Sequence, residues 1–219
     1  MKRLHIETGA GPVSALLTGK GKGSILALGH GAGRDMEDPI LEGAAAALAE
    51  ADISCLRFNF PYRERGSKAP DREPVLRDAW QAAFATAAEH GSPAWVGGKS
   101  LGGRIASMEV ADGLPAGGLV FLGYPLHPPG RPERIRNAHL PGIRVPMLFL
   151  QGTRDAFATP ELLEQTLQMI GASATLHPIE GGDHSFRVRG KPKDDEGTGR
   201  MLGEIAARFI LSQKKPRAR

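Results

Sequence analysis

Ser100 stands at the centre of a short glycine-rich pattern that could present a nucleophile. The pattern is Gly98-Lys99-Ser100-Leu101-Gly102, a complete G-x-S-x-G. An apolar stretch precedes it and a helical pattern follows, so the serine falls on a tight turn from strand to helix. The residues two positions to either side must be small, because larger side chains would collide across such a turn. The pattern therefore predicts acyl transfer with Ser100 as the nucleophile.

The same residues could instead end a phosphate-binding loop. The pattern G-x-x-x-x-G-K-[ST] needs a glycine five positions before Gly98, because its backbone N–H groups wrap the phosphates. That position is Pro93, which has no N–H. The apolar run 118–124 also ends with no acidic residue to hold magnesium. The sequence therefore argues against nucleotide hydrolysis at this loop.

A serine nucleophile needs a general base, and the base needs an acid that fixes its tautomer. In sheets of this type the chain order is serine, then Asp or Glu, then His. Asp155 follows the apolar run 145–152, and His184 lies in a glycine-rich loop after the run 174–181. Asp183 is a competing acid, but adjacent residues rarely align an imidazole correctly. A simpler role for Asp155 is to cap the loop that follows it.

The oxyanion of the tetrahedral intermediate needs two N–H donors. One is expected from the backbone of Leu101, the residue after the nucleophile. The other is expected from the loop His30-Gly31-Ala32-Gly33, with Ala32 as the donor and Gly31 as the alternative. His30 is expected to brace this loop rather than to move protons. The competing interpretation of the loop is a generic glycine turn.

These residues need a scaffold of alternating strands and helices. Apolar runs predict strands at 24–30, 54–60, 93–98, 118–124, 145–152 and 174–181, and helical periodicity predicts helices at 39–52, 73–90, 100–112, 159–171 and 199–213. The last-but-one helix carries Thr159 as its N-cap and Gly171 as its stop. This order predicts a doubly wound, mostly parallel α/β sheet flanked by helices, whose ligands bind at the carboxyl ends of the strands.

Length and composition limit the possibilities further. The 219 residues suit one domain, expected over 1–213, with a basic tail at 214–219. The single cysteine, Cys55, lies in an apolar run and is expected to be a buried thiol in a reducing cytoplasm. No apolar run reaches the roughly 20 residues of a membrane span. The N-terminal segment is expected to form a strand and shows no export signal. The net charge of +4 reflects mainly 187–193 and 212–219, expected to be a solvated loop and tail.

Several strings resemble an established family. "GHGAGRDM", "RFNFPYRERG", "GGKSLGGRIAS", "GYPLHPPGRPERIRNAHL" and "FLQGTRDAF" are similar to the small, dienelactone-hydrolase-like group of the α/β-hydrolase superfamily. The bacterial subgroup concerned also resembles the hydrolase-like domain of a eukaryotic chromatin-complex subunit. The similarity runs from about residue 24 to residue 186. It implies that Ser100, Asp155 and His184 form the triad, and that neither a metal nor an organic cofactor is needed.

The loops suggest how a substrate is held. The segment between Tyr124 and Pro146 is short where larger relatives insert a lid, so no substantial lid is expected. Candidate substrate-binding residues are Gly31, Arg34, Lys99 and Tyr124. Lys99 is expected to be a solvated charge at the pocket mouth, with attraction of an anionic substrate as the alternative. Candidates for a basic rim that would favour a carboxylate are Arg34, Arg63, Arg65 and Arg131.

Two functions remain at this point. The first is a cytoplasmic serine hydrolase that cleaves small esters, thioesters or similar acyl bonds through an acyl-enzyme. Its partner is a small-molecule acyl substrate, with no nucleic acid and no membrane involved, and its oligomeric state is open. The second is a non-catalytic interaction module on the same fold, since a fold does not imply a function. The presence of all three triad side chains favours the enzyme.

Overall fold

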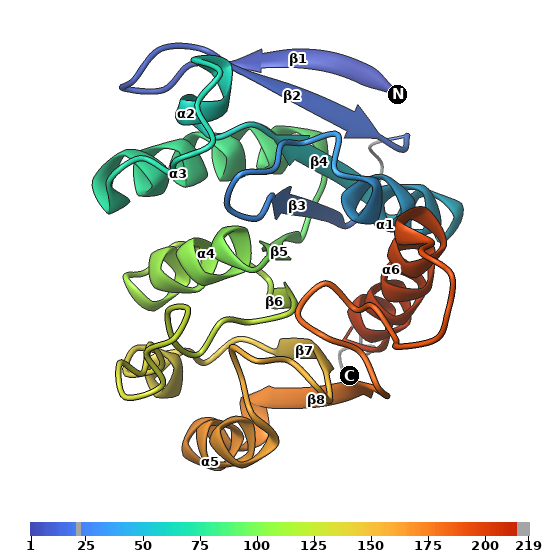
Figure 1. The fold of residues 1–219 in the computed structure, drawn as a ribbon. Coiled ribbons are helices and arrows are strands. Elements are labelled where there is room, and N and C mark those ends of the chain that lie inside the picture. The colour runs from blue at the N-terminus through green and yellow to red at the C-terminus, as the bar shows by residue number, and fades with distance from the viewer. Residues whose placement is uncertain (21–22, 214–219) are drawn as a thin grey trace, which may run out of the picture.

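One eight-stranded sheet organises the protein in the computed structural model, which describes residues 1–20 and 23–213 (Figure 1). The strands lie in the order β1-β2-β4-β3-β5-β6-β7-β8. The first two pair antiparallel and β2 pairs antiparallel with β4, whereas all the other pairs are parallel. Their bounds are β1 Lys2–Ile6, β2 Val13–Thr18, β3 Ile25–Gly29, β4 Ser54–Phe58, β5 Ala94–Lys99, β6 Leu119–Leu122, β7 Met147–Gly152 and β8 Ala174–Ile179.

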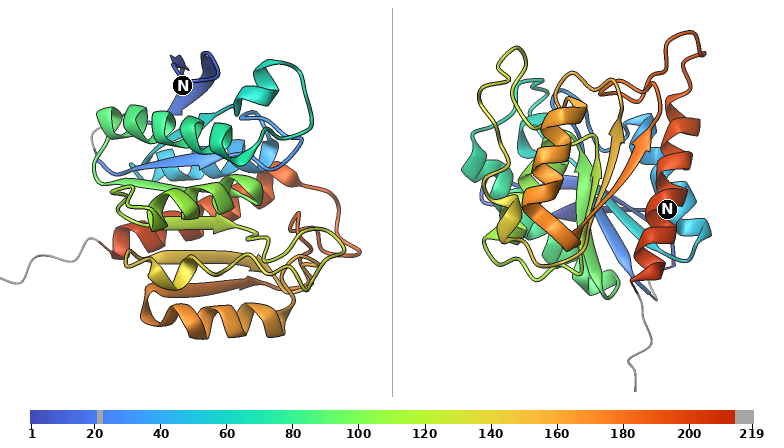
Figure 2. Two further views of the ribbon diagram at one scale, coloured as in Figure 1. Left: turned by 90° about the vertical axis from the view of Figure 1, so that its left-hand side faces the viewer. Right: turned by 90° about the horizontal axis from the view of Figure 1, so that it is seen from below.

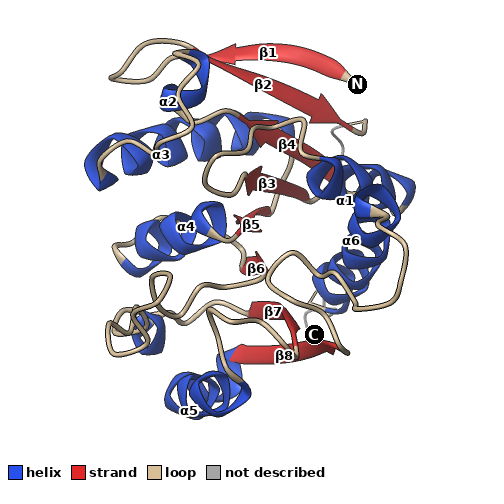
Figure 3. Ribbon diagram, viewed as in Figure 1, coloured by secondary structure: helices blue, strands red, loops and turns tan. Residues whose placement is uncertain are grey.

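Helices cover both faces of this sheet, which gives three layers (Figures 2 and 3). On one face lie α1 (Pro39–Glu50) and α6 (Asp195–Ser212), packed against each other. On the other lie α3 (Glu73–His90), α4 (Leu101–Ala111) and α5 (Pro160–Ile170). The remaining helices are short: α2 (Pro61–Glu64) and the two 3-10 helices η1 (Leu140–Gly142) and η2 (Gly171–Ser173), among the described residues. No helix among the described residues is long and apolar enough to cross a bilayer.

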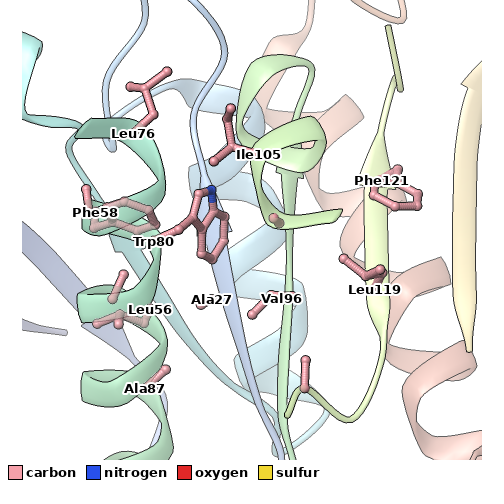
Figure 4. Packing of buried hydrophobic residues seen from close by; sticks show 14 of the residues in the cluster. Ala27, Leu56, Phe58, Leu76, Trp80, Ala87, Val96, Ile105, Leu119 and Phe121 are labelled. Atoms are coloured by element: carbon pink, nitrogen blue, oxygen red, sulfur yellow. The ribbon is translucent and has the colours of Figure 1, made fainter. Parts of the chain in front are cut away.

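The core has two parts, one on each side of the sheet. Every residue of β3, β4, β5, β6 and β7 is buried, as expected of strands covered on both faces. On the α3 and α4 side, Figure 4 shows the indole of Trp80 with Phe58 and Ile105 around it. The Phe58 and Trp80 rings meet edge to face at 5.0 Å. This packing fixes α4, and therefore the residue before it, against the sheet.

The expected elements are confirmed with shifts of a few residues at their ends. Thr159 caps α5 by accepting from the Leu162 N–H, and Gly171 follows with φ 74°. The last helix begins at Asp195 rather than at residue 199, because the Asp194 side chain accepts from the Gly197 N–H and caps it. The N-terminal segment forms two antiparallel strands instead of one. The basic tail expected at 214–219 lies outside the described residues.

Candidate active site

Ser100 lies on the sharp turn between β5 and α4. Its backbone has φ 51° and ψ −111°, a conformation that residues with a side chain rarely adopt. The Ser100 N–H donates to Leu122 O on β6 at 3.3 Å, and Ser100 O accepts from the Arg104 N–H at 3.0 Å. The surrounding hydrogen bonds and packing thus hold a strained backbone, an arrangement that is concentrated at functional sites.

Backbone carbonyls of the neighbouring strands leave no room for a side chain at the glycines around Ser100. A Cβ at Gly98 or at Gly102 would collide with the same carbonyl oxygen, that of Gly29 at the end of β3. A Cβ at Gly97 would collide with Val120 O. The indole N–H of Trp80 donates to Gly102 O at 3.0 Å and holds the start of α4 from behind. The steric reason expected for the G-x-S-x-G pattern is therefore present in the structure.

Ser100, His184 and Asp155 form a continuous chain of hydrogen bonds. Ser100 Oγ lies 2.8 Å from His184 Nε2, and His184 Nδ1 lies 2.7 Å from Asp155 Oδ2. A carboxylate can only accept, so Nδ1 carries the proton and Nε2 is left to accept from the serine hydroxyl. The three residues follow β5, β7 and β8 at the carboxyl ends of the strands. The structure thus brings together the residues that were expected from the sequence.

Asp155 is held by two further donors. Gln151 Nε2 donates to Oδ2 at 2.5 Å, and the Phe157 N–H donates to Oδ1 at 2.8 Å. Gln151 is itself fixed, because its Oε1 accepts from the Tyr124 N–H at 2.8 Å. Gln151 was not predicted from the sequence. The available signal was a polar residue near the end of an otherwise apolar strand, and the structure buries it to 1% exposure.

Asp183 does not contact the imidazole next to it. Its Oδ1 accepts from the N–H groups of Ser185 and Arg187, at 2.7 and 3.0 Å, and so caps the turn that carries His184. This turn also lies against the loop that carries Asp155: the Arg154 N–H donates to Gly182 O at 2.8 Å. A Cβ at Gly152 would collide with that same oxygen. The close approach of the two loops accounts for the contact between His184 and Asp155.

The loop expected to supply the second oxyanion donor packs against the serine turn. An ideal Cβ on Gly31 would lie 3.8 Å from the Ser100 Cβ. Among residues 1–20 and 23–213, the N–H groups of Ala32 and Leu101 donate to no protein acceptor. Both residues line the cavity in front of Ser100. Two donors are therefore free to bind an oxygen atom there.

His30 braces this loop, as expected. Its Nε2 accepts from the Phe60 N–H at 3.1 Å, and Nδ1 lies 2.9 Å from Gly31 O. The ring is fully buried, and burial lowers its pKa from 6.5 to about 4. A neutral imidazole with its proton on Nδ1 satisfies both contacts. His30 is thus neutral at pH 7 and belongs to the framework of the loop.

A cavity of about 500 Å³ opens in front of Ser100 and His184. Gly31, Arg34 and Lys99 line it, as expected. Further lining cations that the sequence analysis did not single out are Arg104, Arg136 and Arg187. The segment between β6 and β7 contains a single helical turn, η1, among its described residues. The cavity thus has no helical lid, in agreement with the expectation.

The predicted basic rim is wrong in three of its four members. Arg63 and Arg65 are not among the residues that line the cavity, and they pair with Asp35 and Asp71. Arg131 lies in an exposed turn and is not part of the cavity lining. Only Arg34 of the predicted set lines the cavity, where it pairs with Asp38 at 3.5 Å.

The prediction that Tyr124 binds the substrate is also wrong, because its ring lies in the core. Its hydroxyl donates to Arg136 O at 3.1 Å, and burial raises its pKa to about 12. The same region holds a second serine–histidine contact, with Ser107 Oγ 2.8 Å from His139 Nε2. Ser107 is fully buried within α4 and its hydroxyl is 2.7 Å from Arg104 O. This second contact therefore belongs to the packing of α4.

The expectation that Lys99 is a solvated charge is wrong, because the structure buries its side chain. The residue is 7% exposed, and its Nζ donates to the backbone oxygen of His184 at 3.0 Å. Burial lowers the pKa of this ammonium. Nζ also lies 5.7 Å from the centre of the Phe186 ring. The side chain thus runs inward from the serine turn to the histidine loop.

Side chains that could bind a metal ion are not clustered in the part of the chain that the structure describes. No group of three or more His, Cys, Asp or Glu side chains is placed there to hold an ion. Cys55 is fully buried, and burial raises the pKa of its thiol to about 12.

Comparisons with known proteins find relatives that share this fold. A family model described as an alpha/beta hydrolase domain matches residues 22–210. An alpha-beta serine hydrolase homologue from Coxiella burnetii is 20% identical, with 95% of this chain and 97% of that chain covered and a TM-score of 0.72. A dienelactone hydrolase from Anabaena variabilis is 19% identical, with 96% of each chain covered and a TM-score of 0.73. A serine hydrolase without a lid from Xanthomonas campestris is 18% identical, with 100% and 96% covered and a TM-score of 0.70.

Proposed function

Because the chain belongs to the alpha/beta hydrolase family, we propose that it is a serine hydrolase that cleaves small esters, thioesters or related acyl bonds. The observation that carries the proposal is the hydrogen-bond chain from Ser100 Oγ through His184 to Asp155 Oδ2. A serine hydroxyl is a weak nucleophile until a base within hydrogen-bond reach takes its proton. His184 Nε2, at 2.8 Å, is such a base.

The reaction follows from these positions. Ser100 Oγ attacks the acyl carbon while its proton passes to His184 Nε2, and the carbonyl oxygen becomes an oxyanion. His184 then gives the proton to the leaving alcohol or thiol, which departs and leaves an acyl ester on Ser100. Water attacks this ester while His184 takes its proton, and His184 then returns the proton to Ser100 Oγ as the acid is released. Asp155 keeps the imidazole in the required tautomer and stabilises its protonated form.

The oxyanion is bound by the N–H groups of Ala32 and Leu101 in this proposal. Both donors are free of protein acceptors among the described residues, and both residues line the cavity at Ser100. Removing one such donor from a site of this kind typically costs about 100-fold to 1000-fold in kcat. Because these donors are backbone groups, His30, Gly98 and Gly102 contribute by fixing the directions of the two N–H bonds.

The cavity supports a small substrate. Its volume of about 500 Å³ lies in the lower half of the range of pockets that hold small ligands. The neighbour from Anabaena variabilis is a dienelactone hydrolase, and a lactone is a cyclic ester. We propose the same size class here, a small-molecule acyl compound. A cytoplasmic location is proposed as well, on the basis of the single, buried thiol.

Labelling with a fluorophosphonate tests the proposal directly, because this probe reacts with activated serines. We expect the wild-type protein to be labelled and Ser100→Ala to be unlabelled at the same melting temperature. Ser107→Ala is the matched control, since Ser107 also contacts a histidine yet is buried within α4. Labelling that survives in Ser100→Ala, or none in the wild type, would contradict the proposal and favour the interaction module. A series of p-nitrophenyl esters of increasing acyl length then defines the substrate size.

A further inference from the structure

Lys99 has the position of a brace between the nucleophile and the base. It is the last residue of β5, directly before Ser100, so its backbone moves with the serine turn. Its Nζ ends 3.0 Å from the backbone oxygen of His184. One side chain therefore links the two segments whose separation sets the contact between Ser100 Oγ and His184 Nε2.

The ammonium has few other partners. Over residues 1–20 and 23–213, no carboxylate lies within ion-pair distance of Lys99 Nζ, and His184 O is its one hydrogen-bond acceptor. The charges of Asp38, Asp155 and Asp183 favour its protonated form, whereas burial and the charge of Arg34 oppose it. A buried ammonium without a carboxylate is costly, so the single hydrogen bond is the contact that fixes the direction of this side chain.

The histidine loop depends on this contact in turn. His184 O accepts no other hydrogen bond within the described part of the chain. Two residues later the loop turns sharply at Phe186, whose φ is 62°, and the Phe186 ring lies beside Lys99 Nζ. The stem of Lys99 also packs near Gly31 in the oxyanion loop: an ideal Cβ there would lie 3.8 Å from Lys99 Cγ. Lys99 thus touches the histidine loop and the oxyanion loop together.

We propose that Lys99 is a positioning residue, which holds the backbone of His184 so that its Nε2 stays within hydrogen-bond reach of Ser100 Oγ. The inference rests on the proposed hydrolase function. In this proposal Lys99, the residue before the nucleophile in the G-x-S-x-G pattern, positions the catalytic base and does not bind the substrate. Loss of the ammonium should therefore slow the chemical step and leave substrate affinity nearly unchanged.

The test compares Lys99→Met with the wild type on one activated ester. Methionine keeps the length of the apolar stem and removes the donor. We expect kcat to fall by about 10-fold to 100-fold, as small misplacements of catalytic groups do, with KM within about twofold. The rate of fluorophosphonate labelling should fall in proportion. Lys191→Met, at an exposed position on the loop that follows His184, is the matched control and should leave both parameters unchanged.

Chemical rescue separates positioning from a general loss of structure. Lys99→Cys is alkylated with 2-bromoethylamine, which forms a thioether, releases bromide and restores an ammonium at nearly the original length. Cys55 is fully buried, whereas position 99 lines the cavity at Ser100, so the reagent can reach the new thiol through the cavity and does not reach Cys55. We expect the alkylated protein to recover most of the lost kcat, and the treated wild type to be unaffected. If methionine prevents folding, Lys99→Gln replaces it, since its amide falls about one bond short of His184 O.

The outcomes are distinct. A wild type that hydrolyses no ester and takes no label overturns the proposed function itself. An active wild type with an equally fast Lys99→Met protein overturns the positioning role alone. A change confined to KM assigns Lys99 to substrate binding and also overturns it, as does a failure of alkylation to restore kcat in a folded Lys99→Cys protein.

Discussion

The imidazole of His184 donates from Nδ1 to Asp155 Oδ2 at 2.7 Å, across 29 positions of sequence, and not to Asp183, its neighbour in the chain. Asp183 instead accepts from two backbone N–H groups of the same turn. Two carboxylates near one histidine therefore have separate tasks. One faces the ring, and the other shapes the loop that carries the ring.

This separation predicts unequal effects of two matched substitutions. Asp155→Asn should lower kcat by about 1000-fold to 10,000-fold, because an amide no longer enforces the Nδ1–H tautomer of His184. Asp183→Asn should keep activity within a few-fold of the wild type and lose about 1 kcal/mol of stability from weakened turn bonds. Steady-state ester hydrolysis and urea unfolding of both proteins check this. Equal losses of kcat would show that the acid has been wrongly assigned.

Gln151 is expected to support Asp155 from behind. Gln151→Leu removes the donor at 2.5 Å from Oδ2 and the acceptor for the Tyr124 N–H, both in a buried place. A hydrogen bond to a charged group contributes about 1.5 to 3 kcal/mol, so both stability and kcat/KM should fall, the latter by about tenfold or more. Gln168→Leu, at an exposed position on α5, should change neither quantity. Wild-type kinetics in the Gln151→Leu protein would show that Gln151 does not support Asp155 in catalysis.

The glycine turn gives a stability prediction that needs no assay of activity. A Cβ at Gly102 would meet the carbonyl of Gly29, which is fixed in the sheet and cannot move aside. Gly102→Ala should therefore cost more than about 3 kcal/mol or prevent folding. Gly142→Ala is the control, because a Cβ there meets nothing within 4 Å. Calorimetry on the two variants decides the point, and similar melting temperatures would contradict the steric account.

Burial of His30 predicts an acid-labile fold. Its pKa is about 4 in the folded protein and 6.5 as the ordinary value, so the unfolded chain takes up this proton first as the pH falls. The stabilisation is complete above pH 6.5 and is lost progressively down to pH 4, at about 1.4 kcal/mol per pH unit and about 3 kcal/mol in all.

The measurement is the free energy of unfolding at several pH values between 4 and 7. His30→Asn should be less stable at pH 7 yet show a shallower dependence across this window than the wild type. His177→Asn, at an exposed position on β8, should follow the wild-type curve. An unchanged slope in His30→Asn would assign the acid sensitivity to other groups.

The sequence was sufficient for the parts of the site that depend on chain order. Ser100, Asp155 and His184 each follow a strand, and carboxyl ends of parallel strands meet at one edge of a sheet. Strand and helix positions followed from periodicity, with small errors where a cap such as Asp194 moved the start of a helix. The choice between Asp155 and Asp183 could be argued, but only the loop contacts fix the hydrogen bonds.

What the sequence could not supply is the direction of side chains at loop junctions. Lys99 looked solvated because its burial depends on two loops, 30–33 and 184–186, that close over it from distant parts of the chain. Tyr124 looked like a pocket residue because it follows a strand, yet its ring turns into the core beside Ser107 and His139. Gln151 resembled the end of an apolar strand. Such contacts are long-range, and local patterns carry no record of them.

The backbone of Ser100 has a further consequence for how this protein can change. At φ 51° and ψ −111°, a residue with a side chain is held at a cost of about 1 to 3 kcal/mol that glycine would largely avoid. Glycine, which has no nucleophilic side chain, is therefore expected to be more stable than serine at this position. Activity and stability thus make opposite demands on position 100. A variant library selected only for thermal resistance should accumulate inactive proteins, unless it is also selected for turnover.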